Sequence, residues 1–177
     1  TEELAEVMQA AQYLHPVTQS AILFHAWRIA GQGVARDTEA VVMAACHGGT
    51  MGRRQGQFLP VALAGMTALR AAGSAHSRLA AWISGTDAAV LAALMQLDRL
   101  TAWHAAARVA LADLSGRTPH LLVDLFAEWP MVSAPMAEAR TKASRAAVQR
   151  NLQTLTDRGL IREMTGQGRY RLWVAKG

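Results

Sequence analysis

The spacing of apolar residues along the last third of the chain predicts three short helices followed by a β-hairpin. The first helix covers residues 119–129. The second follows Ser133 and the third follows Ser144, because a serine hydroxyl can accept hydrogen bonds from the free amide groups at a helix start. Residues 160–165 and 169–174 are rich in β-formers, and the glycine-containing turn between them is typical of a hairpin. This order of elements predicts a winged helix-turn-helix.

Residues 1–118 show helical periodicity almost throughout, with abundant alanine and few β-branched runs. Five helices are expected there, over residues 4–14, 17–29, 38–45, 58–71 and 88–114. The last is the longest, and it follows the capping residues Thr86 and Asp87. The apolar seam of the last helix predicts packing against another helix, in the same chain or in a second copy. We therefore expect a mainly α protein, with an N-terminal helical bundle (1–118) before a C-terminal winged helix-turn-helix with a short β-hairpin (119–177).

The third predicted helix of the last segment divides into two faces at about 100° per residue. Val148, Leu152 and Leu155 share one face at the spacing of core residues. The opposite face carries side chains suited to reading bases: Ala146, Gln149, Arg150 and Gln153. Glutamine can form two hydrogen bonds to adenine, arginine can form two to guanine, and alanine can touch a thymine methyl group. A solvated helix face also carries Arg and Gln, so this pattern alone does not separate recognition from solubility.

Further basic and polar residues flank that helix at positions better suited to the DNA backbone than to the bases. The predicted contacts of phosphate groups, or of the wing, are Arg140, Lys142, Ser144, Arg145, Arg169 and Arg171. Lys142 stands where turns of this kind usually carry glycine. The geometry of the turn between the second and third helices therefore stays open from the sequence.

The distribution of charge favours recognition over solubility. Residues 140–171 hold eight basic and two acidic residues, a net charge of +6, whereas residues 1–118 hold nine and eight, a net charge of +1. A clustered basic surface is the electrostatic footprint of phosphate contact, so we expect double-stranded DNA as the partner. A homodimer would present two recognition helices to half-sites about one helical turn apart.

From its composition, the chain is expected to be cytoplasmic. The single cysteine, Cys46, cannot form an internal disulfide, which favours a reducing compartment. Every apolar stretch of eighteen residues is interrupted by a charge or a break, and no charged-then-apolar leader opens the chain, so no membrane partner is expected. The histidines lack the spacing of a metal site, and no cofactor is expected. Trp129 and Trp173 are expected in the small core beneath the wing.

A glycine-rich stretch over residues 47–56 is the one place in the first domain where chemistry is indicated. Glycine frees backbone amides, and two arginines stand beside them, so an anion could be held there. The residues of this candidate loop are Gly49, Gly52, Arg53 and Arg54. The stretch lacks the lysine and the Ser/Thr of a nucleotide P-loop. An ordinary surface turn with solvated arginines is the alternative interpretation.

Two segments of the C-terminal part resemble a known family: residues 130–136 (Pro-Met-Val-Ser-Ala-Pro-Met) and residues 159–173 (from Gly-Leu-Ile-Arg-Glu to Tyr-Arg-Leu-Trp). They resemble an uncharacterised family of alphaproteobacterial proteins, often plasmid-borne, in which a domain of unknown function precedes a helix-turn-helix DNA-binding domain. The resemblance covers about the last 60 residues well and the helical part more loosely. It implies a transcriptional regulator.

The stretch 51–60, Met-Gly-Arg-Arg-Gln-Gly-Gln-Phe-Leu-Pro, shows a more distant resemblance to Fic-type adenylyltransferases, which also place a helical domain before a winged helix. When Pro60 is laid on the proline of their HPFxxGNGRxGRxxxP motif, Gly52 and Arg53 match. Ala45 then stands at the catalytic histidine and Gly49 at the acid, so the resemblance implies a decayed active site and no enzymatic activity.

Two functions from different classes therefore stand as hypotheses. The favoured one is a DNA-binding transcriptional regulator whose non-catalytic helical domain serves dimerisation or ligand sensing. The alternative is a nucleotide- or anion-binding remnant of a Fic-like enzyme, with a loop at residues 48–56 and a winged helix that contacts protein.

Overall fold

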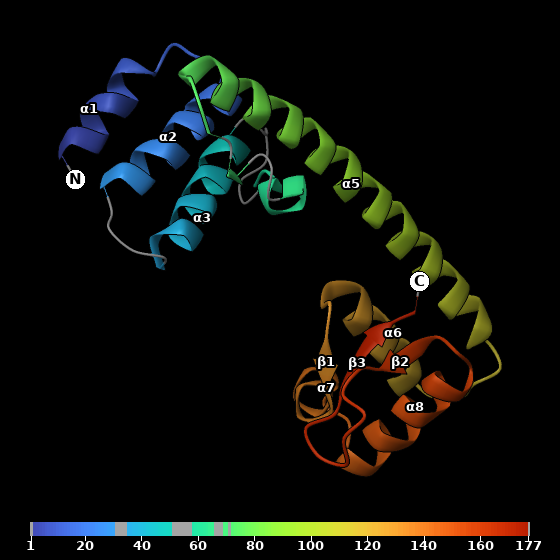
Figure 1. The fold of residues 1–177 in the computed structure, drawn as a ribbon. Helices are drawn as coiled ribbons and strands as arrows, with labels where there is room; N and C mark the ends of the chain where they lie inside the picture. Colours follow the sequence, from blue (N-terminus) through green and yellow to red (C-terminus); the bar gives the residue numbers. More distant parts are fainter. Residues whose placement is uncertain (1, 31–34, 51–57, 66–68, 71, 177) are drawn as a thin grey trace. The chain divides into compact units, whose positions relative to one another are not determined.

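The computed structural model describes residues 2–30, 35–50, 58–65, 69–70 and 72–176 (Figure 1). The chain is mainly α and divides into two compact units, residues 1–95 and residues 96–177. Each unit has its own hydrophobic core. One long helix, α5 (Ala75–Ala110), supplies residues to both cores, because Trp82 belongs to the first and Trp103 to the second.

The described part of the first unit is mainly helical, as the sequence predicts, but the helix expected over residues 58–71 does not begin at residue 58, because residues 58–60 are not helical and Val61–Ala64 form a 3-10 helix. Its elements are α1 (Glu2–Ala10), α2 (Pro16–Ala30), α3 (Ala35–Gly49), the 3-10 helix η1 (Val61–Ala64) and the first part of α5. Figure 1 shows α2 lying beside α3, and Phe24 of α2 stacks on the buried Trp82 of α5 at a centroid distance of 5.1 Å. The indole nitrogen of Trp82 donates to the buried Ser20 hydroxyl at 3.2 Å. This pairing lets a polar indole lie inside the core without loss of a hydrogen bond.

Helix α5 begins at Ala75, eleven residues before Thr86, the first of the two capping residues expected for it. Ser74 supplies the start, because its hydroxyl accepts a hydrogen bond from the Ser77 amide at 3.1 Å. Thr86 is buried inside the helix. The sequence prediction was wrong here because Thr and Asp near an apolar run also occur within helices, when tertiary packing outweighs local preference.

Within the described residues, α5 is long and apolar enough to cross a membrane by length and composition, with a mean hydropathy of 1.3 over its best 18-residue window. No such indication came from the sequence, because charged residues interrupt the apolar stretch of this helix. Only 17% of that window is buried, although Trp82 and Trp103 of the same helix each pack into a hydrophobic core.

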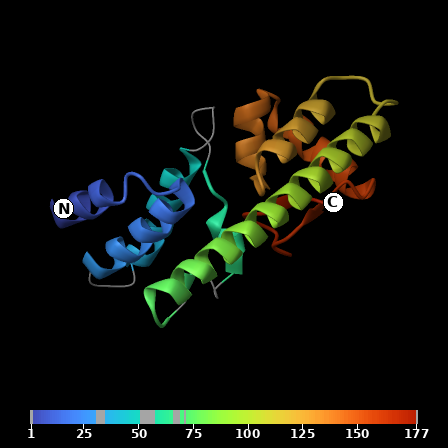
Figure 2. The ribbon, with the colours of Figure 1, turned by 90° about the horizontal axis from the view of Figure 1, so that it is seen from above.

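The second unit contains a winged helix. Its elements are α6 (Thr118–Glu128), β1 (Val132–Ser133), α7 (Ala134–Thr141), α8 (Arg145–Asp157), β2 (Ile161–Glu163) and β3 (Leu172–Ala175), with the last part of α5. The strands form an antiparallel sheet in the order β1-β3-β2. Both views show α6, α7 and α8 gathered around this sheet (Figures 1 and 2). The predicted order of three helices and a hairpin is confirmed.

The core of the second unit includes α5 as well as the winged helix. Trp103, Ala107 and Leu111 are buried together with Leu122, Phe126, Val148, Leu152, Leu155, Ile161 and Trp173. The indole nitrogen of Trp103 donates to the Leu160 carbonyl oxygen at 2.8 Å. The last part of α5 therefore belongs to the same compact unit, residues 96–177, as the winged helix.

Two details of the small sheet differ from expectation. The two-residue strand β1 was not predicted, because two residues are too few to show a period. Trp173 is buried in the core as expected, but Trp129 is 42% exposed, so its assignment to the core beneath the wing was wrong. The Arg140 guanidinium covers the Trp129 ring at 5.4 Å and gives the ring a partner at the surface.

Candidate nucleic-acid interface

Helix α8 presents the exposed polar face that its sequence predicts. Val148, Leu152 and Leu155 are buried, at 0%, 1% and 0% exposure. The four candidate base-reading residues are all exposed: Ala146, Gln149, Arg150 and Gln153. The Gln153 side-chain amide donates to the Asp157 carboxylate at 2.7 Å, one turn further along the same face. One face of α8 therefore packs against the core, and the opposite face is exposed to solvent.

The starts of α7 and α8 are capped by the two serines singled out from the sequence. The Ser133 hydroxyl accepts from the Met136 amide at 3.3 Å, and the Ser144 hydroxyl accepts from the Ala147 amide at 3.3 Å. Between the helices, Lys142 has φ 57° and ψ 22°, in the left-handed region. This is the conformation that glycine adopts most readily, so the lysine makes the usual turn at a conformational cost.

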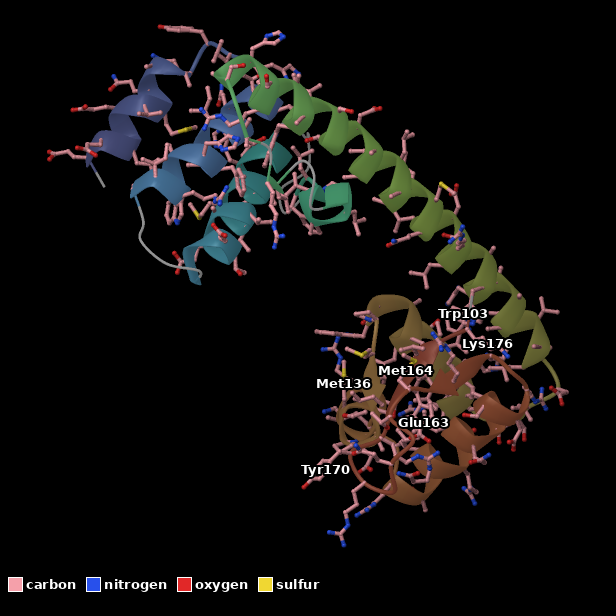
Figure 3. All side chains as sticks on the ribbon, viewed as in Figure 1. Trp103, Met136, Glu163, Met164, Tyr170 and Lys176 are labelled. Atoms are coloured by element: carbon pink, nitrogen blue, oxygen red, sulfur yellow. The ribbon has the colours of Figure 1, made fainter. Side chains whose placement is uncertain are left out.

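A groove runs between the first turns of α8 and the wing. It has a volume of about 610 Å³, and its walls include Arg145 and Gln149 of α8, Pro135 of α7, and Arg169 and Tyr170 of the wing loop (residues 164–171). Tyr170 is 87% exposed and points away from the body of the unit (Figure 3). Basic and hydrogen-bonding side chains therefore line the same surface as the exposed face of α8.

The eight basic residues of segment 140–171 divide into two groups. Arg140, Arg158 and Arg171 form ion pairs with carboxylates of the second unit. The other five are exposed and take part in none of the ion pairs found among the described residues: Lys142, Arg145, Arg150, Arg162 and Arg169. The charge available for an anionic partner therefore comes mainly from these five side chains.

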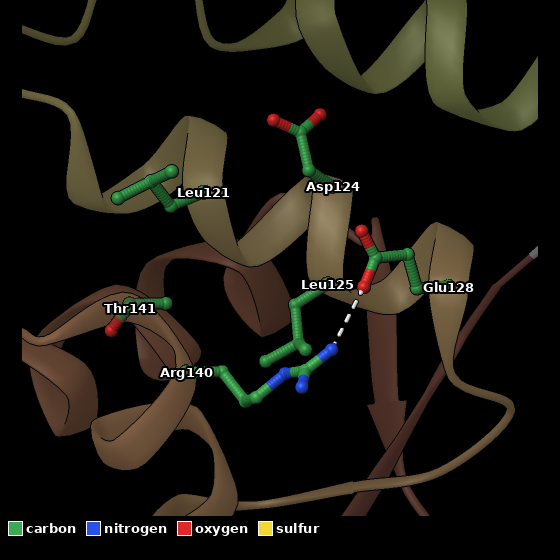
Figure 4. A pocket seen from close by; sticks show the side chains of 6 residues that line it. All are labelled: Leu121, Asp124, Leu125, Glu128, Arg140 and Thr141. Atoms are coloured by element: carbon green, nitrogen blue, oxygen red, sulfur yellow. Dashed lines mark hydrogen bonds and ion pairs between the residues drawn. The ribbon is translucent and has the colours of Figure 1, made fainter.

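Arg140 lies at a hollow between α6 and α7, as Figure 4 shows. The hollow has a volume of about 340 Å³, and its lining includes Leu121, Asp124 and Glu128. Arg140 donates to the Glu128 carboxylate at 3.3 Å. Its guanidinium is half-exposed, so a phosphate could compete with Glu128 for it.

Arg171 is held more tightly than Arg140. Its Nε donates to the Glu163 carboxylate at 2.7 Å, and its guanidinium covers the Trp173 ring at 4.9 Å. The hydrogen bonds from Arg171 and then from Thr165 hold the pKa of the Glu163 carboxyl below its ordinary value. Because the folded-state pKa is lowered, this ion pair persists until the pH falls through that lowered value.

Arg158, whose sequence position indicates only a positive charge, joins α8 to the end of α5. It caps the end of α8, forms two hydrogen bonds to the Asp113 carboxylate at 2.6 and 2.8 Å, and donates to the Ala110 carbonyl oxygen. The hydrogen bond from Arg158 lowers the pKa of Asp113. No local pattern could have indicated this contact, because the partners are 45 residues apart in sequence.

The candidate anion-binding loop lies mostly outside the described residues. Gly49 is the last residue of α3, whereas Gly52, Arg53 and Arg54 are among the residues that the structure does not describe. Over the part of the chain that it does describe, no group of three or more His, Cys, Asp or Glu side chains is arranged to hold a metal ion.

Comparison with known families agrees with this geometry. A family model described as "HTH DNA binding domain" matches residues 119–174, the segment from the start of α6 to β3. Residues 119–174 therefore form a helix-turn-helix DNA-binding domain, and its sheet gives it the architecture of a winged helix. A comparison with curated proteins finds no match to the chain.

Replacing Lys142 by glycine is expected to have opposite effects on stability and on DNA binding. Glycine removes the cost of the left-handed backbone, and a net gain of about 0.5–1 kcal/mol in the free energy of unfolding is expected. Loss of the exposed charge should weaken duplex binding. Thermal unfolding and a duplex titration measure the two effects. Lys142→Asn is the matched control, because it removes the same charge and tolerates the same backbone. Equal loss of stability in both variants would refute the backbone argument.

Proposed function

We propose that this protein is a sequence-specific DNA-binding transcriptional regulator that acts on the nucleoid in the cytoplasm. The observation that carries the proposal is the exposed polar face of α8, which stands beside a groove lined by Arg145, Gln149 and Arg169 within a helix-turn-helix DNA-binding domain. A helix of this width fits the major groove of B-form DNA. The domain is a binding module, and the proposed activity needs no catalysis.

Base reading is assigned to the first three turns of α8. Arg150 would donate two hydrogen bonds to a guanine, Gln149 and Gln153 would pair with adenine edges, and Ala146 would contact a thymine methyl group. Gln153 would first give up its hydrogen bond to Asp157. This exchange replaces one hydrogen bond by another, so its net cost is small.

Backbone contact is assigned to the exposed cations around that helix. Arg145 and Arg169 both line the groove, and Lys142 and Ser144 stand at the turn before α8. Arg140 would join them once a phosphate displaces Glu128. Such contacts hold the protein in register on the duplex and contribute most of the salt-dependent affinity.

Dimerisation is assigned to the helical region. On α5, Leu91, Leu94 and Met95 are 56%, 53% and 56% exposed, and exposed apolar clusters of this kind mark interaction surfaces. A dimer built through this helix would deliver two copies of α8 to a palindromic site. Leu94→Glu is expected to convert the dimer to a monomer in light scattering. A wild-type chain that is monomeric at all concentrations would refute this part of the proposal.

A selection of bound sequences from random duplexes tests the function directly. We expect enrichment of a defined motif, with two inverted half-sites about 10 base pairs apart if the chain acts as a dimer. A matched selection with the Gln149→Ala variant should lose preference at one position of each half-site. The absence of any enriched motif would count against sequence-specific regulation.

The nucleotide- or anion-binding alternative, like the kinship with Fic-type enzymes and with the alphaproteobacterial family, remains a prediction. It depends on the glycine-rich loop alone. A rise in melting temperature with ATP that disappears in the Arg53→Ala, Arg54→Ala double variant would favour it. An unchanged melting temperature would leave the loop as a surface turn.

A further inference from the structure

The wing loop is joined at its base by a cluster of three side chains. Glu163, the last residue of β2, accepts from Arg171 at 2.7 Å and from the Thr165 hydroxyl at 2.9 Å. The same Thr165 hydroxyl accepts from the Leu172 amide at 3.4 Å. Figure 3 shows Glu163 inside the unit and Tyr170 at its outer edge. The cluster therefore connects the two arms of the wing where they leave the sheet.

The backbone between the arms contributes few constraints of its own. Met164 donates to the Leu172 carbonyl oxygen at 2.8 Å, the last backbone hydrogen bond of the hairpin among the described residues. Beyond it, Gly166 and Tyr170 both have positive φ, at 60° and 57°. A loop with two residues in the left-handed region and no ladder of hydrogen bonds depends on side chains to hold one position.

Arg171 has the features of a structural residue. Glu163 neutralises its charge, the Trp173 ring lies under its guanidinium, and the Glu163 side chain is only 19% exposed. Both Arg171, at 38% exposure, and Arg169, two residues earlier, line the groove, but Arg169 takes part in none of the ion pairs found among the described residues. The two arginines of the wing therefore differ in kind, although their sequence context is alike.

We propose that Glu163 and Arg171 form a positioning pair that holds the wing loop in its place beside α8. Arg171 is then a structural residue of the wing and not a phosphate ligand. This inference rests on the proposed DNA binding. It deepens that proposal, because it assigns the phosphate contact of the wing to Arg169 and gives an acidic residue a favourable role in binding a polyanion.

Glu163→Ala tests the pair through the sign of its effect on duplex affinity. Removing a carboxylate near DNA should by itself tighten binding. If the pair positions the wing, the variant instead binds about threefold to tenfold more weakly, because the freed loop must be ordered on binding. Glu138→Ala is the matched control, since it removes an acidic residue of α7 and is expected to bind as tightly as the wild type or more so. Tighter binding by Glu163→Ala would overturn the proposal.

Substitutions of the two arginines give a second, independent readout. Arg171→Lys keeps the charge but loses the paired and stacked geometry, so it should weaken binding as much as Arg171→Ala, with an unchanged salt dependence. Arg169→Ala should reduce the slope of log affinity against log salt concentration by about 0.9. A reduced slope in Arg171→Ala, rescued by lysine, would make Arg171 a phosphate ligand and overturn the proposal. If Arg150→Ala also leaves binding unchanged, the proposed function itself fails.

Discussion

A fragment of residues 119–177 is expected to lack a cooperative thermal transition, whereas a fragment of residues 96–177 is expected to fold. The shorter fragment matches the family-defined segment but loses Trp103, Ala107 and Leu111 from the core. It also loses the hydrogen bond from the Trp103 indole to the Leu160 carbonyl and the ion pair between Arg158 and Asp113. Removing a buried tryptophan side chain alone costs about 3–5 kcal/mol, which is a large part of the stability of a domain this small.

Far-UV circular dichroism across a temperature ramp measures this difference. Trp103→Ala in the full chain is the matched control, because it removes the same side chain without removing the backbone of α5. It should lower the transition of the second unit and leave the first unit unchanged. Equal melting temperatures for the two fragments would show that α5 is dispensable for the winged helix, contrary to the packing described above.

The second large effect is expected from reversing the charge of Arg150. Arg150 is exposed near the middle of α8, so Arg150→Glu should leave the melting temperature of the protein nearly unchanged. It should weaken binding to the selected duplex at least about 100-fold. A bidentate arginine–guanine contact contributes about 1–3 kcal/mol, and the new carboxylate is repelled by the phosphates.

Arg99→Glu is the control for this experiment. Arg99 lies on α5, is exposed, and is not part of the groove between α8 and the wing. The Arg99→Glu substitution changes the net charge of the chain by the same amount as Arg150→Glu and should alter duplex affinity by less than about threefold. Similar losses in the two variants would show that overall charge, and not the face of α8, determines binding.

Local features of the winged helix could be predicted from the sequence because they depend on neighbours in the chain. The faces of α8 follow from the spacing of Val148, Leu152 and Leu155, and the two helix starts follow from the capping chemistry of Ser133 and Ser144. These predictions required no knowledge of tertiary contacts.

Features that depend on distant partners could not be predicted. The start of α5, the exposure of Trp129 and the inclusion of α5 in the second core each follow from packing between elements far apart in sequence. The division of the basic residues into paired and exposed groups has the same origin. Charge counting gave Arg158, Arg169 and Arg171 equal weight, although the structure pairs two of them with carboxylates.

A cationic surface around α8 and the wing is expected to bind duplex DNA, and the salt dependence of binding by the Arg145→Ala variant measures its contribution. Arg145 lines the groove at the first turn of α8. Fluorescence anisotropy of a labelled, selected duplex gives the affinity of wild type and variant at several salt concentrations. We expect the affinity of the wild type to decrease steeply with salt and the slope to be smaller by about 0.9 in the variant, because one phosphate contact is lost. Identical slopes and affinities, or wild-type binding that is insensitive to salt, would contradict this expectation.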